Sequence, residues 1–198
     1  HMVAAMLGTQ PSTITNAPAV GDVGITADIL TSLGVGVDID GDRITIDPVE
    51  APGADVPLEF TGLNRIPILL LGPLLARNHE AFVPLVGGDR IGRRPVDFHI
   101  DALERMGAEI TVSDDGITAK ADHLRGAQIT LPYPSVGATE SVLLTAVLAE
   151  GRTVLRNAAV EPEVTELALF LQRMGARIGF KPDRRIVIEG VDRLRGAR

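Results

Sequence analysis

The segment 87–100, which reads GGDRIGRRPVDFHI, contains the residue types best suited to chemistry in this sequence. Two adjacent glycines lead into a cluster of charged and ionisable side chains: Asp89, Arg90, Arg93, Arg94, Asp97 and His99. Glycine lets the backbone approach a ligand closely, and arginine offers a planar, permanently charged donor fork for phosphate or carboxylate oxygens. The segment therefore predicts an anion site, and the alternative is a solvated turn with surface arginines.

A second anion-binding candidate is the start of an apolar helix further along the chain. Ser135, Val136 and Gly137 open this helix, and the free N–H groups and dipole of a helix start suit a phosphate. The alternative is a plain serine N-cap. Arg65 is a further candidate, because a charge beside the very apolar segment 66–76 needs a partner.

Two residues of the first segment have an equally plain structural interpretation. Asp97 can accept hydrogen bonds from a ligand, or it can be the N-cap of a helix that begins at Phe98. His99 can donate to a phosphate, but a lone histidine is more often structural. The four histidines are scattered without paired spacing, so we expect no metal site, and no cofactor is indicated.

The composition narrows the classes of protein that the chain can belong to. The 198 residues include no cysteine, which excludes disulfides, thiolate metal sites and a cysteine nucleophile. The net charge of −7 argues against a nucleic-acid partner. No apolar run reaches the roughly 20 residues of a membrane-spanning helix, so we expect a cytoplasmic protein without a membrane partner. His1 and Met2 are typical of a cloning remnant.

The chain contains a threefold internal repeat, which indicates how these residues are positioned. A helix that ends in Leu-Gly or Met-Gly and is followed by a β-hairpin occurs around Gly34, Gly107 and Gly175, which are spaced 73 and 68 residues apart. Each glycine is predicted to end its helix as a C-cap. Asp-Gly pairs, which favour hairpin turns, follow the first two helices.

A second repeated feature precedes each of these helices, namely an apolar helix tail that leads into a strand such as 81–86. The segments 66–76 and 142–149 are apolar nearly all round, which is typical of helices buried on every side. The sequence thus predicts a single α/β domain over 1–198, built from three helix–strand–helix–hairpin units around buried central helices. The first unit lacks its opening strand and most of its first helix, as in a chain that starts abruptly or an excised piece.

Several consecutive motifs together resemble one known family. They are LGPLLAR at 71–77, GGDRIGRRPVDFHI at 87–100, LERMGAEI, SVGAT at 135–139, LAEGRT and NAAVEPEV. In this order and with few gaps, they are similar to UDP-N-acetylglucosamine 1-carboxyvinyltransferase, an enolpyruvyl transferase of peptidoglycan synthesis. The resemblance runs from about Ala4 to the C-terminus.

The resemblance implies a two-domain parent in which each domain is an inverse α/β barrel and the active site lies between them. This chain would be the domain that binds the UDP end of the substrate, with the second domain as its missing partner. The family's Lys-Asn motif would fall before Ala4. The resemblance therefore implies a catalytically incomplete, substrate-binding part of an enzyme whose substrates are UDP-N-acetylglucosamine and phosphoenolpyruvate.

The resemblance also assigns roles to individual residues. Asp89 stands where most members carry cysteine and would be the general acid, which leads us to expect fosfomycin resistance in the parent enzyme, because a carboxylate is a weaker nucleophile than a thiolate. Arg94 and Arg65 would contact anionic groups. The residues expected along the uridine and the diphosphate are Pro95, Val96, Asp97, His99, Ser135, Val136 and Gly137. Tyr133 stands where the family usually has a lysine.

Three alternatives to this enzyme remain open at the level of sequence. A non-catalytic nucleotide-sugar-binding or regulatory relative with the same fold is favoured weakly by Tyr133. The sister transferase that acts on 3-phosphoshikimate is opposed by the RPVDFHI and SVGAT motifs. An RNA-end-processing enzyme conflicts with the acidic charge and the 3% aromatic content.

Overall fold

A computed structural model describes residues 1–88 and 95–198, and these residues form three sheets with helices between and around them. The first unit contains α1 (Met2–Ala5), β1 (Ser12–Ile14), α2 (Gly21–Ser32), β2 (Gly36–Asp40) and β3 (Arg43–Asp47). The second contains α3 (Ile66–Asn78), β4 (Glu80–Pro84), α4 (Asp97–Arg105), β5 (Glu109–Val112) and β6 (Gly116–Lys120), preceded by the 3-10 helix η1 (Leu58–Phe60). The third contains α5 (Val136–Ala146), β8 (Arg152–Arg156), α6 (Pro162–Arg173), β9 (Arg177–Lys181) and β10 (Arg185–Glu189), preceded by β7 (Gln128–Thr130).

The three sheets share one core arrangement. Their strand orders are β1-β3-β2, β4-β6-β5 and β7-β8-β10-β9, and every pairing is antiparallel except that of β7 with β8. In each sheet the strand that follows the first helix of the unit pairs with the second strand of the hairpin. Aliphatic residues face each other in the register of these pairs, namely Ile14 with Ile44, Val83 with Ile117 and Leu155 with Ile186.

The same helix ending occurs in all three units. Gly34, Gly107 and Gly175 have φ values of 85°, 101° and 108° and directly follow the C-caps of α2, α4 and α6. After each glycine, an amide N–H returns to a carbonyl five residues earlier: Val35 to Leu30, Ala108 to Leu103 and Ala176 to Leu171. This is the Schellman ending that glycine permits, and the predicted C-caps are confirmed.

The units are joined to one another by equivalent contacts, and the last unit meets the first. Short parallel bridges join Asp55 to Phe82, Arg125 to Glu150 and Leu194 to Gly8. The third bridge is extended by hydrogen bonds from the Thr13 amide to the Ala197 carbonyl, 2.9 Å, and from the Ala197 amide to the Ser12 hydroxyl, 3.1 Å. The ring of units is therefore closed by residues near opposite ends of the sequence.

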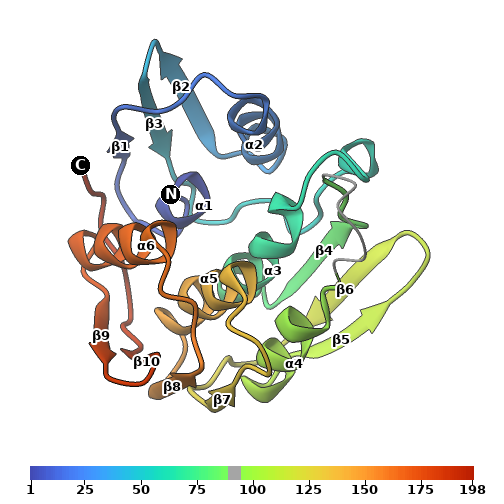
Figure 1. Ribbon diagram of the computed structural model, residues 1–198. Helices are drawn as coiled ribbons and strands as arrows, with labels where there is room; N and C mark the ends of the chain where they lie inside the picture. The colour runs from blue at the N-terminus through green and yellow to red at the C-terminus, as the bar shows by residue number, and fades with distance from the viewer. Residues whose placement is uncertain (89–94) are drawn as a thin grey trace.

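The helices α1, α3 and α5 lie between the three sheets, as Figure 1 shows, and supply much of the hydrophobic core. A Cβ atom on Gly72 of α3 would come within 1.8 Å of the Thr145 hydroxyl of α5. The two helices thus cross where glycine leaves room for the Thr145 side chain, which explains a glycine in the middle of a buried helix despite its poor helix propensity.

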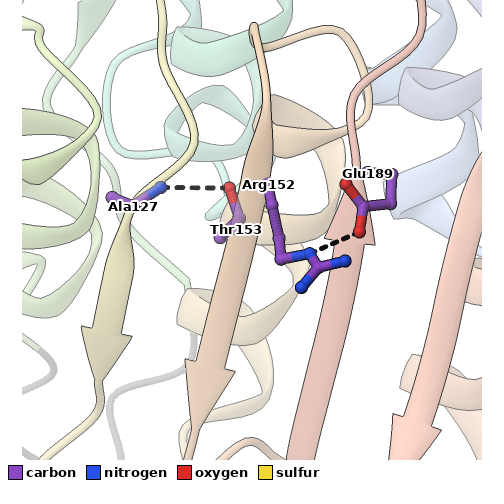
Figure 2. A network of polar contacts seen from close by, with 4 residues as sticks. All are labelled: Ala127, Arg152, Thr153 and Glu189. Atoms are coloured by element: carbon purple, nitrogen blue, oxygen red, sulfur yellow. Dashed lines mark hydrogen bonds and ion pairs between the residues drawn. The ribbon is translucent and has the colours of Figure 1, made fainter.

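Polar contacts at the outer end of the third sheet reinforce its strand pairs. Figure 2 shows Arg152 of β8 paired with Glu189 of β10, its partner in the register. The Thr153 hydroxyl accepts the Ala127 amide N–H at 3.4 Å, which joins the start of β7 to β8. The ion pair is solvent-exposed, so it contributes little to stability, and the register depends on the apolar face instead.

Several predicted boundaries change in the structure. The apolar helix segment expected over 142–149 belongs to α5, which begins at Val136 as the expected serine start requires and ends at Ala146, three residues before the expected end. The strand expected over 81–86 spans Glu80–Pro84. Asp97 is the first residue of α4 and Val96 is its N-cap, so the Asp97 N-cap expectation is wrong. In the described residues no helix has the length and apolarity to cross a bilayer.

Candidate functional site

Three helices begin close together, and most of the predicted site residues that the structure describes lie at these starts. Arg65 is the N-cap of α3, Val96 is the N-cap of α4 and Ser135 is the N-cap of α5. The Arg65 guanidinium donates from Nη2 to the Pro95 carbonyl at 3.5 Å, so the start of α3 touches the segment that enters α4. Pro95 and Asp97 are exposed, whereas Arg65 and Val96 are half-buried.

His99 joins the starts of α4 and α5. Its side chain is buried, and Nδ1 lies 2.6 Å from the Ser141 hydroxyl of α5. A Cβ atom on Gly137 would lie 3.2 Å from Cε1 and 3.4 Å from Nε2 of the imidazole. The ring therefore packs against the first turn of α5. Two of the predicted site residues, His99 and Gly137, are thus in contact.

Burial sets the protonation state of this histidine. The pKa of His99 falls to about 4, chiefly because the ring is buried; the charge of Arg65 acts in the same direction, and the carboxylate of Asp97 opposes both. The imidazole is therefore neutral at neutral pH. A neutral ring positions α5 by hydrogen bonding and packing and adds no positive charge to the site.

The start of α5 has the features of an anion site. The Ser135 hydroxyl accepts the Ala138 amide N–H at 3.3 Å, and the Thr139 hydroxyl donates to the Ser135 carbonyl at 2.7 Å. The predicted serine N-cap is thus confirmed. The amides of Val136 and Gly137 belong to the first turn, which has no intrahelical acceptor, and the positive end of the helix dipole is located there.

Asn64 organises the neighbouring backbone, and the sequence reasoning missed it. Its side-chain oxygen accepts the Ile66 amide N–H at 3.0 Å, its amide nitrogen donates to the Asp22 carboxylate at 3.1 Å, and its carbonyl accepts the Gly87 amide N–H at 3.0 Å. The side chain is buried. An asparagine two residues before an Ile-Pro helix start is the local signal that could have revealed this side-chain bond to the first amide of α3.

Two of the expected site residues lie outside the described part of the chain, and Tyr133 lies next to the site. Asp89, the expected general acid, and Arg94, the expected anion contact, lie outside the described residues 1–88 and 95–198. Tyr133 is 65% exposed and its carbonyl accepts the Ser135 amide N–H at 2.7 Å, so it stands immediately before α5.

A cavity of about 540 Å³ adjoins the other side of the α3 and α5 starts. Ile66 and Glu140 line it together with Asp22 and Glu163. Burial raises the pKa of Glu140, the terminal amine of His1 opposes this shift, and the carboxylate of Glu163 adds to it. Arg173 and Arg198 also line this cavity, but the four carboxylates Asp22, Glu140, Glu163 and Glu166 outnumber them and make it less suitable for an anion than the starts of α3 and α5.

The described part of the site therefore offers groups that could bind and orient an anion. One guanidinium, one helix start and a neutral imidazole converge there, with Asp97 available as an exposed acceptor. In residues 1–88 and 95–198, no three histidine, cysteine, aspartate or glutamate side chains gather in a geometry for a metal ion.

The comparison with protein families gives the class to which this fold and site belong. The family model described as EPSP synthase (3-phosphoshikimate 1-carboxyvinyltransferase) matches residues 1–198. The chain belongs to this family of enolpyruvyl transferases.

Two curated relatives share the name of one particular enzyme within this family. UDP-N-acetylglucosamine 1-carboxyvinyltransferase of Corynebacterium jeikeium is 45% identical over 98% of this chain and 46% of the relative. The enzyme of the same name from Chlamydia muridarum is 47% identical over 96% of this chain and 44% of the relative. The resemblance expected from the sequence is confirmed, and the chain spans about half the length of these curated relatives.

Solved structures show the same fold at lower identity. The enolpyruvyl transferase NikO from Streptomyces tendae superposes with a TM-score of 0.84 at 23% identity, covering 99% of this chain and 47% of that one. EPSP synthase from Acinetobacter baumannii gives a TM-score of 0.75 at 20% identity over 99% and 46% of the two chains. The α/β fold is thus that of the enolpyruvyl transferases.

Proposed function

We propose that this chain is the nucleotide-sugar-binding part of a UDP-N-acetylglucosamine 1-carboxyvinyltransferase. The observation that carries the proposal is the meeting of Arg65, His99 and the α5 start at one end of the molecule, in a chain that is 45% identical to enzymes of that name. The parent enzyme would transfer the enolpyruvyl group of phosphoenolpyruvate to the 3-hydroxyl of the sugar in peptidoglycan synthesis, in the cytoplasm, and release phosphate.

The proposal extends to the architecture. We infer that the closed ring of three units is one inverse α/β barrel of the two that the family resemblance implies, over residues 1–198. The equivalent bridges between the units, including the one from Leu194 to Gly8, support this interpretation. A second domain would be the partner that completes the catalytic cleft, and the isolated chain would bind substrate without turning it over.

The described residues suggest how the substrate would be held. The diphosphate lies at the first turn of α5, where the Val136 and Gly137 amides and the helix dipole favour negative charge. Arg65 supplies a permanent cation nearby, and Asp97 accepts hydrogen bonds from the uridine. Pro95 and Val96 would line the nucleotide.

The catalytic steps depend on residues outside the described part. Asp89 would donate the proton to the methylene carbon of phosphoenolpyruvate, and Arg94 would bind one of the anionic groups. A carboxyl group in place of a thiol would make the parent resistant to fosfomycin. A non-catalytic nucleotide-sugar-binding relative is the second candidate function, and the exposed Tyr133 in the position of the usual lysine favours it.

Calorimetric titration with UDP-N-acetylglucosamine tests the α5 start with a matched pair of variants. Ser135→Asp and Ser135→Asn both keep a side-chain oxygen that can cap the helix, and they differ by one negative charge. We expect the Asp variant to bind about tenfold or more weakly than the Asn variant, because its carboxylate repels the diphosphate.

Thermal unfolding of both variants is the control for folding. Equal affinities of two equally stable variants would place the diphosphate elsewhere. Binding of the unsubstituted chain too weak to detect would reject the nucleotide-sugar proposal itself.

A further inference from the structure

Two histidines face each other at the opposite end of the helices from the proposed nucleotide-sugar site. His79 is the C-cap of α3, whose N-cap is Arg65, and His123 lies between β6 and β7. Their rings form an edge-to-face pair with centroids 6.2 Å apart. Both residues line two adjoining cavities of about 630 Å³ and 280 Å³, so the pair stands where these cavities meet.

The backbone around His79 fixes the orientation and tautomer of its ring. Nδ1 lies 3.3 Å from the Ala121 carbonyl, and the Ala121 amide N–H donates to the His79 carbonyl at 2.9 Å. A carbonyl only accepts, so Nδ1 carries the hydrogen and Nε2 keeps its lone pair. A histidine whose other nitrogen donates to a backbone carbonyl is the usual arrangement of a metal-ligating imidazole.

The backbone conformation of His79 is a second, independent feature. This residue has φ 63° and ψ −4°, in the left-handed region that glycine or asparagine adopts more easily at a helix end. The conformation directs the side chain back to Ala121 and toward His123. A sterically disfavoured residue with a fixed, exposed ring suggests a role beyond ending the helix.

The surroundings favour a cation over an anion. The carboxylates that line the two cavities are Glu80, Glu109, Asp122, Glu150 and Asp192, and the basic residues are Arg105, Lys120 and Arg125. Two of the basic residues have acidic partners, since Arg105 pairs with Asp101 and Arg125 with Glu150. The histidine pair is thus located in a locally acidic part of the surface.

We propose that His79 and His123 bind one divalent transition-metal ion of the Zn²⁺, Ni²⁺ or Cu²⁺ class. Imidazole nitrogen is a preferred ligand of these ions, whereas Mg²⁺ prefers oxygen. The described residues provide two imidazoles at this point and no group of three ligating side chains, so water completes the coordination. The two histidines are 44 positions apart in the sequence, which explains why no paired spacing is visible there.

Calorimetric titration of the metal-free chain with ZnCl₂ tests the proposal. We expect one equivalent of Zn²⁺ to bind, and His79→Asn and His123→Asn each to weaken that binding by about tenfold or more. Asparagine tolerates the left-handed conformation of residue 79, which keeps the helix ending intact. His1→Asn is the control, because an amino-terminal histidine offers a competing amine and imidazole, and it should leave the binding unchanged.

NMR of the imidazole protons gives a second readout, because the chain has only four histidines. Zn²⁺ should shift the resonances of His79 and His123 together and leave those of His1 and His99 in place, and MgCl₂ should shift none of the four. Binding that persists in both variants, or a shift confined to His1, would overturn the site. So would the absence of any zinc-dependent shift at millimolar Zn²⁺.

Discussion

At the scale of single residues, His99 shows how burial decides what a side chain can do. An exposed histidine beside an anion site could become a cation and bind a phosphate. Here the ring is buried between α4 and α5, hydrogen-bonded to the Ser141 hydroxyl, and its pKa falls to about 4. The imidazole therefore acts by holding the first turn of α5 against α4, and Arg65 is the permanent cation of the described site.

This burial predicts a specific dependence of stability on pH. The unfolded chain protonates His99 near pH 6.5, whereas the folded chain does so only near pH 4. The contribution of the neutral His99 ring to the free energy of unfolding is thus complete above about pH 6.5. It falls by about 1.4 kcal/mol for each pH unit below that value and is lost once the pH has fallen through the folded pKa. His99→Gln keeps a hydrogen-bonding side chain but does not titrate, so its stability should fall less steeply.

Urea unfolding from pH 4 to 7.5 measures this slope. The exposed His123→Gln variant, in metal-free buffer, should retain the slope of the unsubstituted chain. An identical slope in the His99→Gln variant would show that the ring is not held neutral by burial.

At the scale of elements, the crossing of α3 and α5 positions the two helix starts relative to each other. Gly72 allows this crossing, and Gly72→Ala should destabilise the chain by about 2 kcal/mol, because the new Cβ would lie 1.8 Å from the Thr145 hydroxyl. Gly24→Ala is the matched control. It lies in α2 with nothing within 4 Å of the new Cβ, and should stabilise by up to about 1 kcal/mol.

Denaturant unfolding of the two variants gives the comparison directly. A neutral Gly72→Ala would mean that the helices separate at little cost, and that the crossing does not define their distance.

The sequence predicted the helices and strands better than the tertiary contacts between them. The glycine endings of α2, α4 and α6 were predictable, because a C-cap glycine followed by a hairpin is a local signal. The start of α5 was also predictable, because a serine before an apolar helix is a local N-cap signal. The contact of His99 with Ser141 spans 42 residues, and it arises only when α4 packs on α5. Such side-chain contacts depend on tertiary packing, which leaves no signal in the local sequence.

At the scale of the whole molecule, contacts between the first and the last unit close the ring on which the candidate site is built. The chain returns at Ala197 to hydrogen-bond with Ser12 and Thr13, and Arg77 at the end of α3 donates to the Leu7 and Gly8 carbonyls at 2.7 Å and 2.8 Å. The central helices are thus fixed from both sides, and α3 and α5 present their starts together. The proposed anion site would then be preformed, and its ligand would bind at a small cost in conformational entropy.

The substrate preference of the folded chain tests the central claim most directly. Parallel calorimetric titrations with UDP-N-acetylglucosamine and with 3-phosphoshikimate compare the two substrates that the relatives and the family model name. We predict saturable binding of UDP-N-acetylglucosamine and at least tenfold weaker binding of 3-phosphoshikimate, a difference of about 1.4 kcal/mol. Equal affinities, or a preference for 3-phosphoshikimate, would contradict the account.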